Sequence, residues 1–444
     1  MVSLRIWLTV TVAALGLARD AVRAQTVSVM VQAIPLVTRA DPTATRSALT
    51  EGYLTQPVVM AHAWYGPLQA IGTLNLEGLT LQRGELTTGG YGEGYVDRRH
   101  PHAYVHELLV GAAGTAAGFG ASIFAGRGFA PFGSDDPMVR PFEKYPVNHH
   151  LAQVLERVVV VGAVRRGPVI AEVGTFNGDE PTGPGSVPKF TRVGDSWASR
   201  LTLLPLAGIE LSASLAHVTS PEIPQGHGLD QRKGSVVARY AHASRTSSRY
   251  ALVEWEQTGE RDRGVLITKL QSVLAEGAYC RAGASLAARI ERTDRPEEEP
   301  LLDPFRTPRP PPDLSNLGES RWTTLTMSLA APPTRAWFVT GQPFVEVARL
   351  AVAPGDPAGI FNSGLRYGTD RMWMFSAGVR LWAGMMHGRM GRYGVAETDA
   401  PMQMAMGTPS HAAESDTMPG MPGMTHDVPM ATSPRISLIS SCGP

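Results

Sequence analysis

The sequence predicts an all-β protein: a transmembrane antiparallel β-barrel of about 14–18 strands, most simply about 16, followed by a disordered C-terminal tail. Three observations predict it. Apolar and polar residues alternate along many segments, these segments approach the ~10 residues of a tilted membrane strand, and tight turns alternate with long irregular loops. The chain divides into a signal peptide (1–24), an N-terminal periplasmic segment (25–62), the barrel (63–384) and a Met/His-rich tail (385–444).

The first 24 residues have the three parts of a secretory signal peptide. Residues 1–5 carry one positive charge, residues 6–17 form an apolar core, and Val22, Arg23 and Ala24 fit a signal-peptidase site. The core is shorter than the ~20 residues of a membrane-spanning helix. We therefore expect an exported protein, with a retained N-terminal anchor as the alternative.

The alternation of apolar and polar residues is the main structural signal. It is clearest in residues 209–217, 250–256, 286–290, 323–329 and 375–383. Such a period puts apolar side chains on one face of a strand and polar ones on the other. A soluble β-sandwich gives the same alternation. The arginines and glutamates on the polar faces, and long loops at 178–193, 220–234 and 292–320, favour a barrel with a wet lumen.

The uncharged window 108–126 competes as a short membrane helix. Its several glycines weaken any helix, and two strands joined by a small-residue turn near Gly114 and Gly118 explain it as well. We favour the two strands because the rest of the chain has the period of strands.

Composition and motifs exclude several function classes. Forty basic residues balance forty acidic ones, so the net charge does not attract nucleic acid, and two cysteines make no disulfide framework. The sequence contains no Gly-x-Ser-x-Gly, phosphate-binding loop or His-Glu-x-x-His motif. We therefore expect neither an enzyme nor a required cofactor.

Three short elements resemble those of outer-membrane porins. Residues 125–133 (AGRGFAPFG) and 172–179 (EVGTFNGD) resemble elements of the phosphate-selective porin O and P family, and residues 376–383 (SAGVRLWA) are similar to the closing signal by which outer-membrane barrels are recognised for assembly. The resemblance implies a porin-like barrel in the outer membrane of a Gram-negative-type bacterium, with its lipid and its barrel-assembly machinery as partners. Assembly as a homotrimer is left open.

Residues 134–151 are too rich in proline for a plain strand. We expect a loop or short helix that folds into the lumen and narrows it, with an ordinary exposed loop as the alternative. Rings of charged side chains select among ions. The residues that would set the charge of this constriction are Asp135, Asp136, Arg140, His149 and His150.

Charged residues on the polar faces of the strands are expected to line the lumen: Arg165, Arg200, Arg239, Glu254, Arg289 and Arg380. The arginines either form an anion path or balance acids such as Glu210 and Glu256 in a solvated network. Equal numbers of both signs favour the network.

Two groups of residues suit a metal ion. His100, His102 and His106, with Glu107 as an oxygen ligand, have the density that binds copper, nickel or zinc, and a hydrogen-bonded turn at the rim is the alternative. Thioethers suit Cu(I) and imidazoles Cu(II). The tail candidates are Met402, Met404, Met406, His411, Met418, Met421, Met424 and His426. These clusters resemble those of copper-resistance outer-membrane proteins, and an inert or partner-docking tail is the alternative.

The favoured functional prediction is a porin-like channel for passive diffusion of small hydrophilic solutes or ions. One alternative is a copper-binding, copper-resistance outer-membrane protein whose barrel is mainly an anchor. The other is a secreted soluble β-sandwich protein.

Overall fold

The computed structural model describes residues 25–43, 46–81, 102–181, 183–187, 189–223, 225–244, 246–297, 318–355, 361–384 and 389–398. The predicted signal peptide and residues 399–444 lie outside the described residues.

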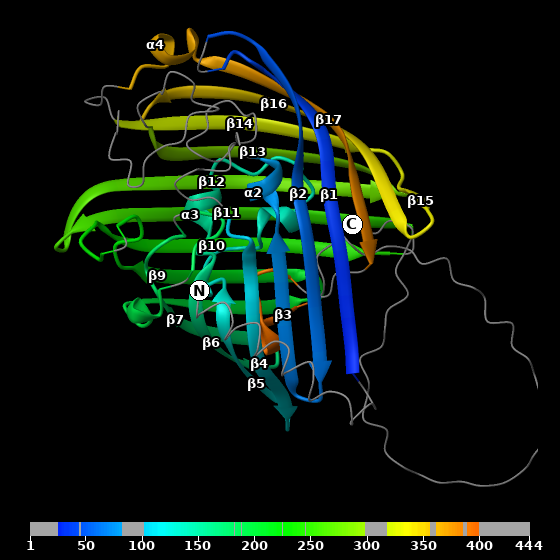
Figure 1. The fold of residues 1–444 in the computed structure, drawn as a ribbon, viewed down its shortest axis with the longest axis vertical. Coiled ribbons are helices and arrows are strands. Elements are labelled where there is room, and N and C mark those ends of the chain that lie inside the picture. Colours follow the sequence, from blue (N-terminus) through cyan, green and yellow to red (C-terminus); the bar gives the residue numbers. More distant parts are fainter. Residues whose placement is uncertain are drawn as a thin grey trace, which may run out of the picture.

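The described chain forms one sheet of seventeen strands (Figure 1). The strands are β1 (Gln25–Asp41), β2 (Leu49–Tyr65), β3 (Leu68–Asn75), β4 (Val105–Ala116), β5 (Phe119–Gly128), β6 (Arg157–Arg166), β7 (Val169–Phe176), β8 (Ser196–Leu206), β9 (Ile209–Val218), β10 (Asp230–Ala243), β11 (Ser247–Asp262), β12 (Val265–Arg281), β13 (Ala284–Glu297), β14 (Gly318–Ala330), β15 (Thr334–Ala336), β16 (Val339–Pro354) and β17 (Arg371–Gly384). Short helical turns lie in the connections: α2 (Glu77–Thr80), η2 (Pro137–Val139), α3 (His149–Ala152), η3 (Phe190–Arg192) and α4 (Ser363–Tyr367). One more, η4 (Gly394–Ala396), follows the last strand.

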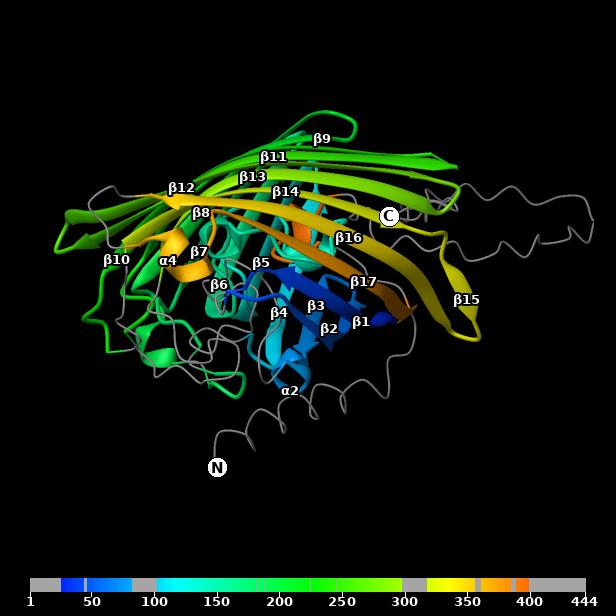
Figure 2. The ribbon, with the colours of Figure 1, turned by 90° about the horizontal axis from the view of Figure 1, so that it is seen from above.

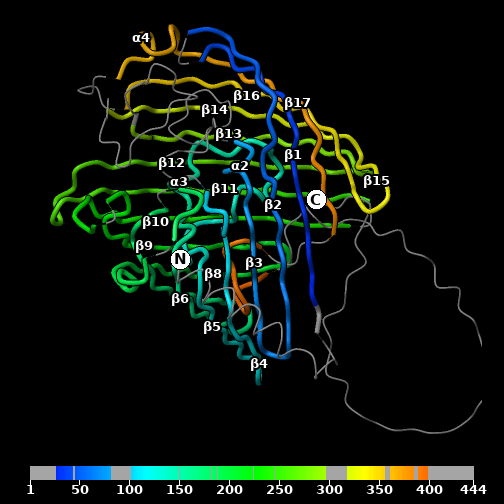
Figure 3. Tube along the Cα trace, viewed as in Figure 1, coloured from blue at the N-terminus to red at the C-terminus, as the bar shows by residue number. Residues whose placement is uncertain are grey.

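The sheet closes on itself into an antiparallel barrel. The strand β1 pairs with both β2 and β17, and the β1–β17 pairing runs from Met30 opposite Gly384 to Asp41 opposite Trp373 (Figure 3). The three-residue β15 lies in the connection between β14 and β16, which pair directly with each other. Without β15, sixteen strands form the wall, so the predicted barrel is confirmed.

The outer face of the wall is apolar and the inner face is charged. On β11, Val253 and Trp255 are 52% and 38% exposed, whereas Glu254 and Glu256 on the opposite face are 0% exposed. A soluble protein buries its apolar face instead. The same inversion recurs around the wall, with exposed apolar side chains at Val29, Val110, Ile123, Val173, Leu215, Ile290, Leu325 and Phe375. The β-sandwich alternative is therefore wrong.

A charge on this outer face is expected to destabilise the barrel in a bilayer. Val253→Arg, near the middle of β11, should lower the free energy of unfolding by about 2–4 kcal/mol, because the guanidinium then faces hydrocarbon. Val265→Arg, at the turn end of β12, is the matched control and should cost about 0–1 kcal/mol. Urea unfolding in lipid vesicles compares them. Equal losses would contradict a bilayer around the outer face.

The predicted periplasmic segment at 25–62 is wrong, because β1 and most of β2 belong to the wall. On β1, outward-facing Val29 and Val31 alternate with inward-facing residues, as on the other strands. The sequence hides this alternation because inward positions such as Met30 and Ile34 are apolar too.

Residues 108–126 fall in the two strands that the sequence favours, β4 and β5. The tight turn between them lies at Ala117 and Gly118, whose φ angles are 51° and 75°. Among the described residues, no helix is long and apolar enough to span a membrane.

Two segments fold into the interior of the barrel. The inner loop, residues 129–156, connects β5 to β6, and the inner C-terminal segment, residues 389–398, follows β17 (Figure 2). Phe132 of the loop and Met390 and Tyr393 of the C-terminal segment belong to one buried apolar cluster with side chains of the wall. The prediction of a disordered tail beginning at 385 is therefore wrong for residues 389–398, which are packed inside the barrel.

Candidate functional site

The inner loop brings its predicted charged residues into the lumen. Of the five residues predicted for the constriction, four have buried side chains: Asp135, Asp136, Arg140 and His149. His150 falls in α3, but its side chain lies outside the described residues. The position of the loop is thus as the sequence predicts, while its role in selecting ions stays a prediction.

Glu254 of β11 anchors the inner loop to the wall. Its carboxylate accepts hydrogen bonds from Ser134 Oγ at 2.7 Å, Asn148 Nδ2 at 2.7 Å and Arg140 Nη2 at 3.1 Å. Arg140 Nη1 also lies 3.8 Å from Glu276 of β12. Burial alone would lower the pKa of Arg140, but these two carboxylates outweigh burial and hold the pKa above its usual value. Arg140 therefore stays charged and links the loop to two strands.

A second ionic cluster joins the inner loop to the inner C-terminal segment. Arg389 Nε donates to Asp135 Oδ1 at 2.6 Å, and Arg239 Nε of β10 lies 3.6 Å from the other carboxylate oxygen. Both Arg389 and Arg392 donate to Glu210 of β9, Arg392 at 2.6 Å. Burial would raise the pKa of Asp135, but the surrounding arginines lower it. Charge thus ties two segments, far apart in sequence, to each other and to the wall.

A third cluster joins the inner loop to strands β12, β13 and β17. Arg289 Nε donates to Glu276 at 2.8 Å, and its Nη1 donates to the carbonyl oxygen of Lys144 at 2.9 Å. Arg380 Nη2 lies 2.8 Å from Glu143 Oε1. The loop is therefore held along its length by paired charges.

The lumen arginines pair with acids, which is the network that the charge balance favours. Arg200 Nε donates to Glu172 Oε2 at 2.6 Å, and its Nη2 donates to the carbonyl oxygen of Gly391 at 2.8 Å. Arg239, Arg289 and Arg380 have the partners given above. Arg165 lies half-buried near the end of β6.

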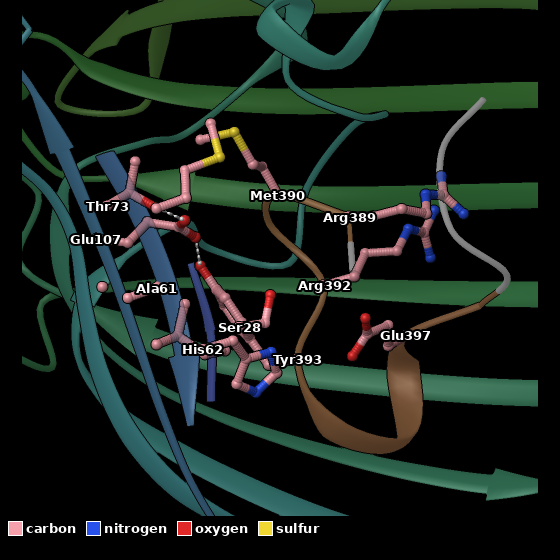
Figure 4. A pocket seen from close by; sticks show the side chains of 13 residues that line it. Ser28, Ala61, His62, Thr73, Glu107, Arg389, Met390, Arg392, Tyr393 and Glu397 are labelled. Atoms are coloured by element: carbon pink, nitrogen blue, oxygen red, sulfur yellow. Dashed lines mark hydrogen bonds between the residues drawn. The ribbon is translucent and has the colours of Figure 1, made fainter. Parts of the chain in front are cut away.

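Sequence reasoning missed the inner C-terminal segment as part of the site. Tyr393 Oη donates a hydrogen bond to Glu107 of β4 at 2.9 Å and accepts one from the backbone N–H of Phe129 at 2.9 Å. Glu107 also accepts a hydrogen bond from Thr73 at 2.9 Å (Figure 4). Burial and the charge of Glu107 raise the pKa of Tyr393 well above its usual value, so the phenol keeps its proton. The available signal was the GRMGRYG run at 388–394, with two arginines and a tyrosine close together in a Met-rich stretch.

Open space remains beside both inner segments. A pocket between strands β1–β4 and the inner C-terminal segment is lined by His62, Glu107, Arg389, Arg392, Tyr393 and Glu397, among others (Figure 4). A second pocket lies beside the inner loop and is lined in part by Asp135, Glu143, Arg239, Tyr250, Ser328 and Arg380. Both pockets present charged groups of both signs, which suits hydrated solutes.

The structure brings His102 and His106 together with Glu156, at the end of the inner loop. Glu156 Oε1 lies 2.6 Å from His106 Nδ1 and 3.3 Å from His102 Nδ1. Burial opposes both charges, but the contacts with Glu156 raise the pKa of His102 to about 9, and the contacts with the histidines lower the pKa of Glu156 to about 2. The carboxylate beside these rings is thus Glu156 and not the predicted Glu107. His100 lies outside the described residues.

The metal-ligating residues predicted in the tail also lie outside the described residues. They are Met402, Met404, Met406, His411, Met418, Met421, Met424 and His426.

Comparisons with known proteins return solved porin structures. No protein-family model and no curated protein sequence matches the chain. Its structure is similar to an anion-selective porin from Comamonas acidovorans, with 11% identity and a TM-score of 0.47 over 82% of this chain and 100% of that one. It is also similar to the outer-membrane protein OmpT of Vibrio cholerae, with 10% identity and a TM-score of 0.45 over 82% and 99% of the two chains. A third similar structure is Pseudomonas aeruginosa OccK2 in complex with glucuronate, with 10% identity and a TM-score of 0.38 over 81% and 98%.

Proposed function

We propose that the chain is an outer-membrane channel through which small hydrophilic solutes or ions diffuse passively. The observation that carries the proposal is the closed sixteen-strand wall, apolar outside and charged inside. Hydrocarbon suits the outer face, and water with dissolved solutes suits the inner one. The proposal includes a Gram-negative-type outer membrane, with its lipid and barrel-assembly machinery as partners, and involves no catalysis and no cofactor.

Purified protein in planar bilayers is expected to give discrete conductance steps with weak selectivity between K⁺ and Cl⁻. The reason is that lumen arginines are paired with acids, so neither sign of charge dominates the path. The reversal potential in a KCl gradient measures this selectivity. Heat-modifiable migration in gels shows that the barrel is folded. If the folded protein gives no conductance and no swelling of liposomes in sugars, the channel proposal is contradicted.

A finer proposal relates the channel to the phosphate-selective porin O and P family. The elements at 125–133 and 172–179 support it. The first element leads from β5 into the inner loop through Gly133, whose φ is 71° and whose Cβ would lie 1.7 Å from the carbonyl oxygen of Ala152, so this turn requires glycine. Phosphate added to the same recordings should block Cl⁻ current; an unaffected current would contradict this relation. A homotrimer, the form named for one OmpT structure, is the assembly we propose.

A second candidate function is a copper-binding outer-membrane protein. The Met/His-rich composition of residues 402–426 favours it, because thioethers and imidazoles bind Cu(I) and Cu(II). Competition titration with Cu(I) tests it by comparing the full chain with one ended after Thr398. Equal binding by the two chains would contradict a copper site in the tail.

A further inference from the structure

Three metal-ligating side chains meet inside the barrel, where the start of β4 lies against the end of the inner loop. His102, His106 and Glu156 each offer one ligand atom, and these atoms lie within 4.8 Å of one another. The group is shielded from solvent, since the side chain of His106 is 0% exposed and that of Glu156 is 2% exposed. We propose that these residues bind one divalent transition-metal ion, with Zn²⁺ as the best fit. This site does not depend on the proposed channel function.

The backbone at Glu156 is shaped to aim its carboxylate at the two imidazoles. Glu156 has a φ of 61°, in the left-handed region that non-glycine residues seldom adopt. Its Oε1 atom faces both Nδ1 atoms and also accepts the backbone N–H of Ala103 at 2.9 Å. Residues held in such conformations cluster at functional sites. One carboxylate oxygen and two imidazole nitrogens thus converge, although Glu156 and His106 are 50 positions apart in the sequence.

A second carboxylate lies near the other ring nitrogen of His106. His106 Nε2 lies 4.0 Å from Asp136 Oδ2, and both atoms are buried without a hydrogen-bond partner among the described residues. Buried polar atoms normally have partners. In metal sites a ligating histidine donates its second ring N–H to a carboxylate. A metal ion on His106 Nδ1 would place the proton on Nε2, directed toward Asp136, and a closer approach of the two side chains from 4.0 Å would then give both atoms a partner.

The donor set selects the class of metal. Two imidazoles and one carboxylate suit Zn²⁺, Cu²⁺ or Ni²⁺, whereas Mg²⁺ and Ca²⁺ prefer oxygen ligands alone. His149 of the inner loop lies near the group, with its ring centroid 5.8 Å from that of His102. Zinc commonly takes four ligands. A water molecule would take the fourth position.

The metal ion would take the place of the proton that lies between His106 Nδ1 and Glu156 Oε1, and in the neutral ring that proton moves to Nε2. The two atoms are now 2.6 Å apart, as in a strong hydrogen bond. Zinc lies about 2.0–2.2 Å from its nitrogen and oxygen ligands, so this contact must open slightly as the proton leaves. The more exposed His102, with 13% of its side chain accessible, borders a pocket that also contains Gln153 and Glu180, which provides the access route.

Equilibrium dialysis of the full chain in detergent, first stripped with a chelator and then supplied with Zn²⁺ alone, tests the site. We expect wild type to bind one more Zn²⁺ per chain than Glu156→Gln, or to bind it at least about tenfold more tightly. Glu256→Gln is the matched control, because Glu256 is also a buried acid of the lumen but bonds to Ser235 and has no place in the group. It should leave Zn²⁺ binding unchanged.

Two further measurements keep the test decisive. His102→Asn removes a ligand but leaves the bond between His106 and Glu156, so it covers the case in which Glu156→Gln does not fold. Co²⁺ in place of Zn²⁺ should give the visible absorption of a four-coordinate site in wild type and lose it in both variants. Zn²⁺ binding that is the same in wild type and in folded His102→Asn, or the absence of any bound Zn²⁺ in wild type, would overturn the proposal. The group would then be an ionic contact that fastens the inner loop to β4.

Discussion

Ending the chain after Gly384 is expected to raise the single-channel conductance several-fold. This truncation removes the inner C-terminal segment, which packs Met390 and Tyr393 against the inner loop and the wall. The wall itself should still close, because the last strand ends at Gly384 opposite Met30 of β1. The cross-section open to water therefore grows while the barrel persists. Recordings in planar bilayers measure the change.

The same truncation should also shift the channel toward cations. Asp135 and Glu210 lose Arg389 and Arg392, which leaves uncompensated negative charge in the lumen. A chain ended after Thr398 is the matched control, because it keeps residues 389–398 and should conduct like wild type. If both truncations conduct alike, the inner C-terminal segment does not restrict the lumen.

Replacing Glu254 by glutamine is expected to lower the free energy of unfolding by about 3–5 kcal/mol, because it leaves the buried guanidinium of Arg140 without its nearest counter-charge. It also weakens the bonds from Ser134 and Asn148, so the inner loop should leave its position part of the time. Urea unfolding measures the first effect. Frequent transitions between conductance levels in bilayer recordings would report the second.

Glu256→Gln is the control for this substitution. Glu256 lies two residues further along the same face of β11, is equally buried and accepts a bond from Ser235 of the neighbouring strand at 2.8 Å. It makes no hydrogen bond to the inner loop among the described residues. The two variants should therefore share any general cost of a neutral side chain in the lumen, and only Glu254→Gln should release the loop. Indistinguishable variants would contradict the anchoring role of Glu254.

The strands of the wall could be predicted from sequence because each one carries its own signal. On β11 apolar and acidic residues alternate, and this order predicts which side chains face lipid (Val253 and Trp255) and which face the lumen (Glu254 and Glu256). The inner loop could be predicted from an equally local signal, because its prolines exclude a strand and the segments on either side of it are apolar strands. The prediction failed for β1, because apolar residues occupy both of its faces and the alternation of apolar and polar residues is lost.

The partners inside the lumen could not be predicted, because they depend on contacts between distant parts of the chain. Arg389 meets Asp135 across 254 positions, and Glu156 meets His106 across 50. In the sequence Arg389 belongs to a run of methionine and glycine that predicts disorder. Its burial can be explained only by the acids of the wall and the inner loop that pair with its charge.

The pairing of β1 with β17 dictates an order of events during insertion. Until the final strand arrives, β1 has an edge of unsatisfied backbone groups, which hydrocarbon does not tolerate. The seam therefore cannot be sealed before residue 384 has been delivered. Residues 389–398 come later still in the chain and yet finish inside the ring. The last residues that the structure places inside the ring are therefore carried by the very strand that closes it.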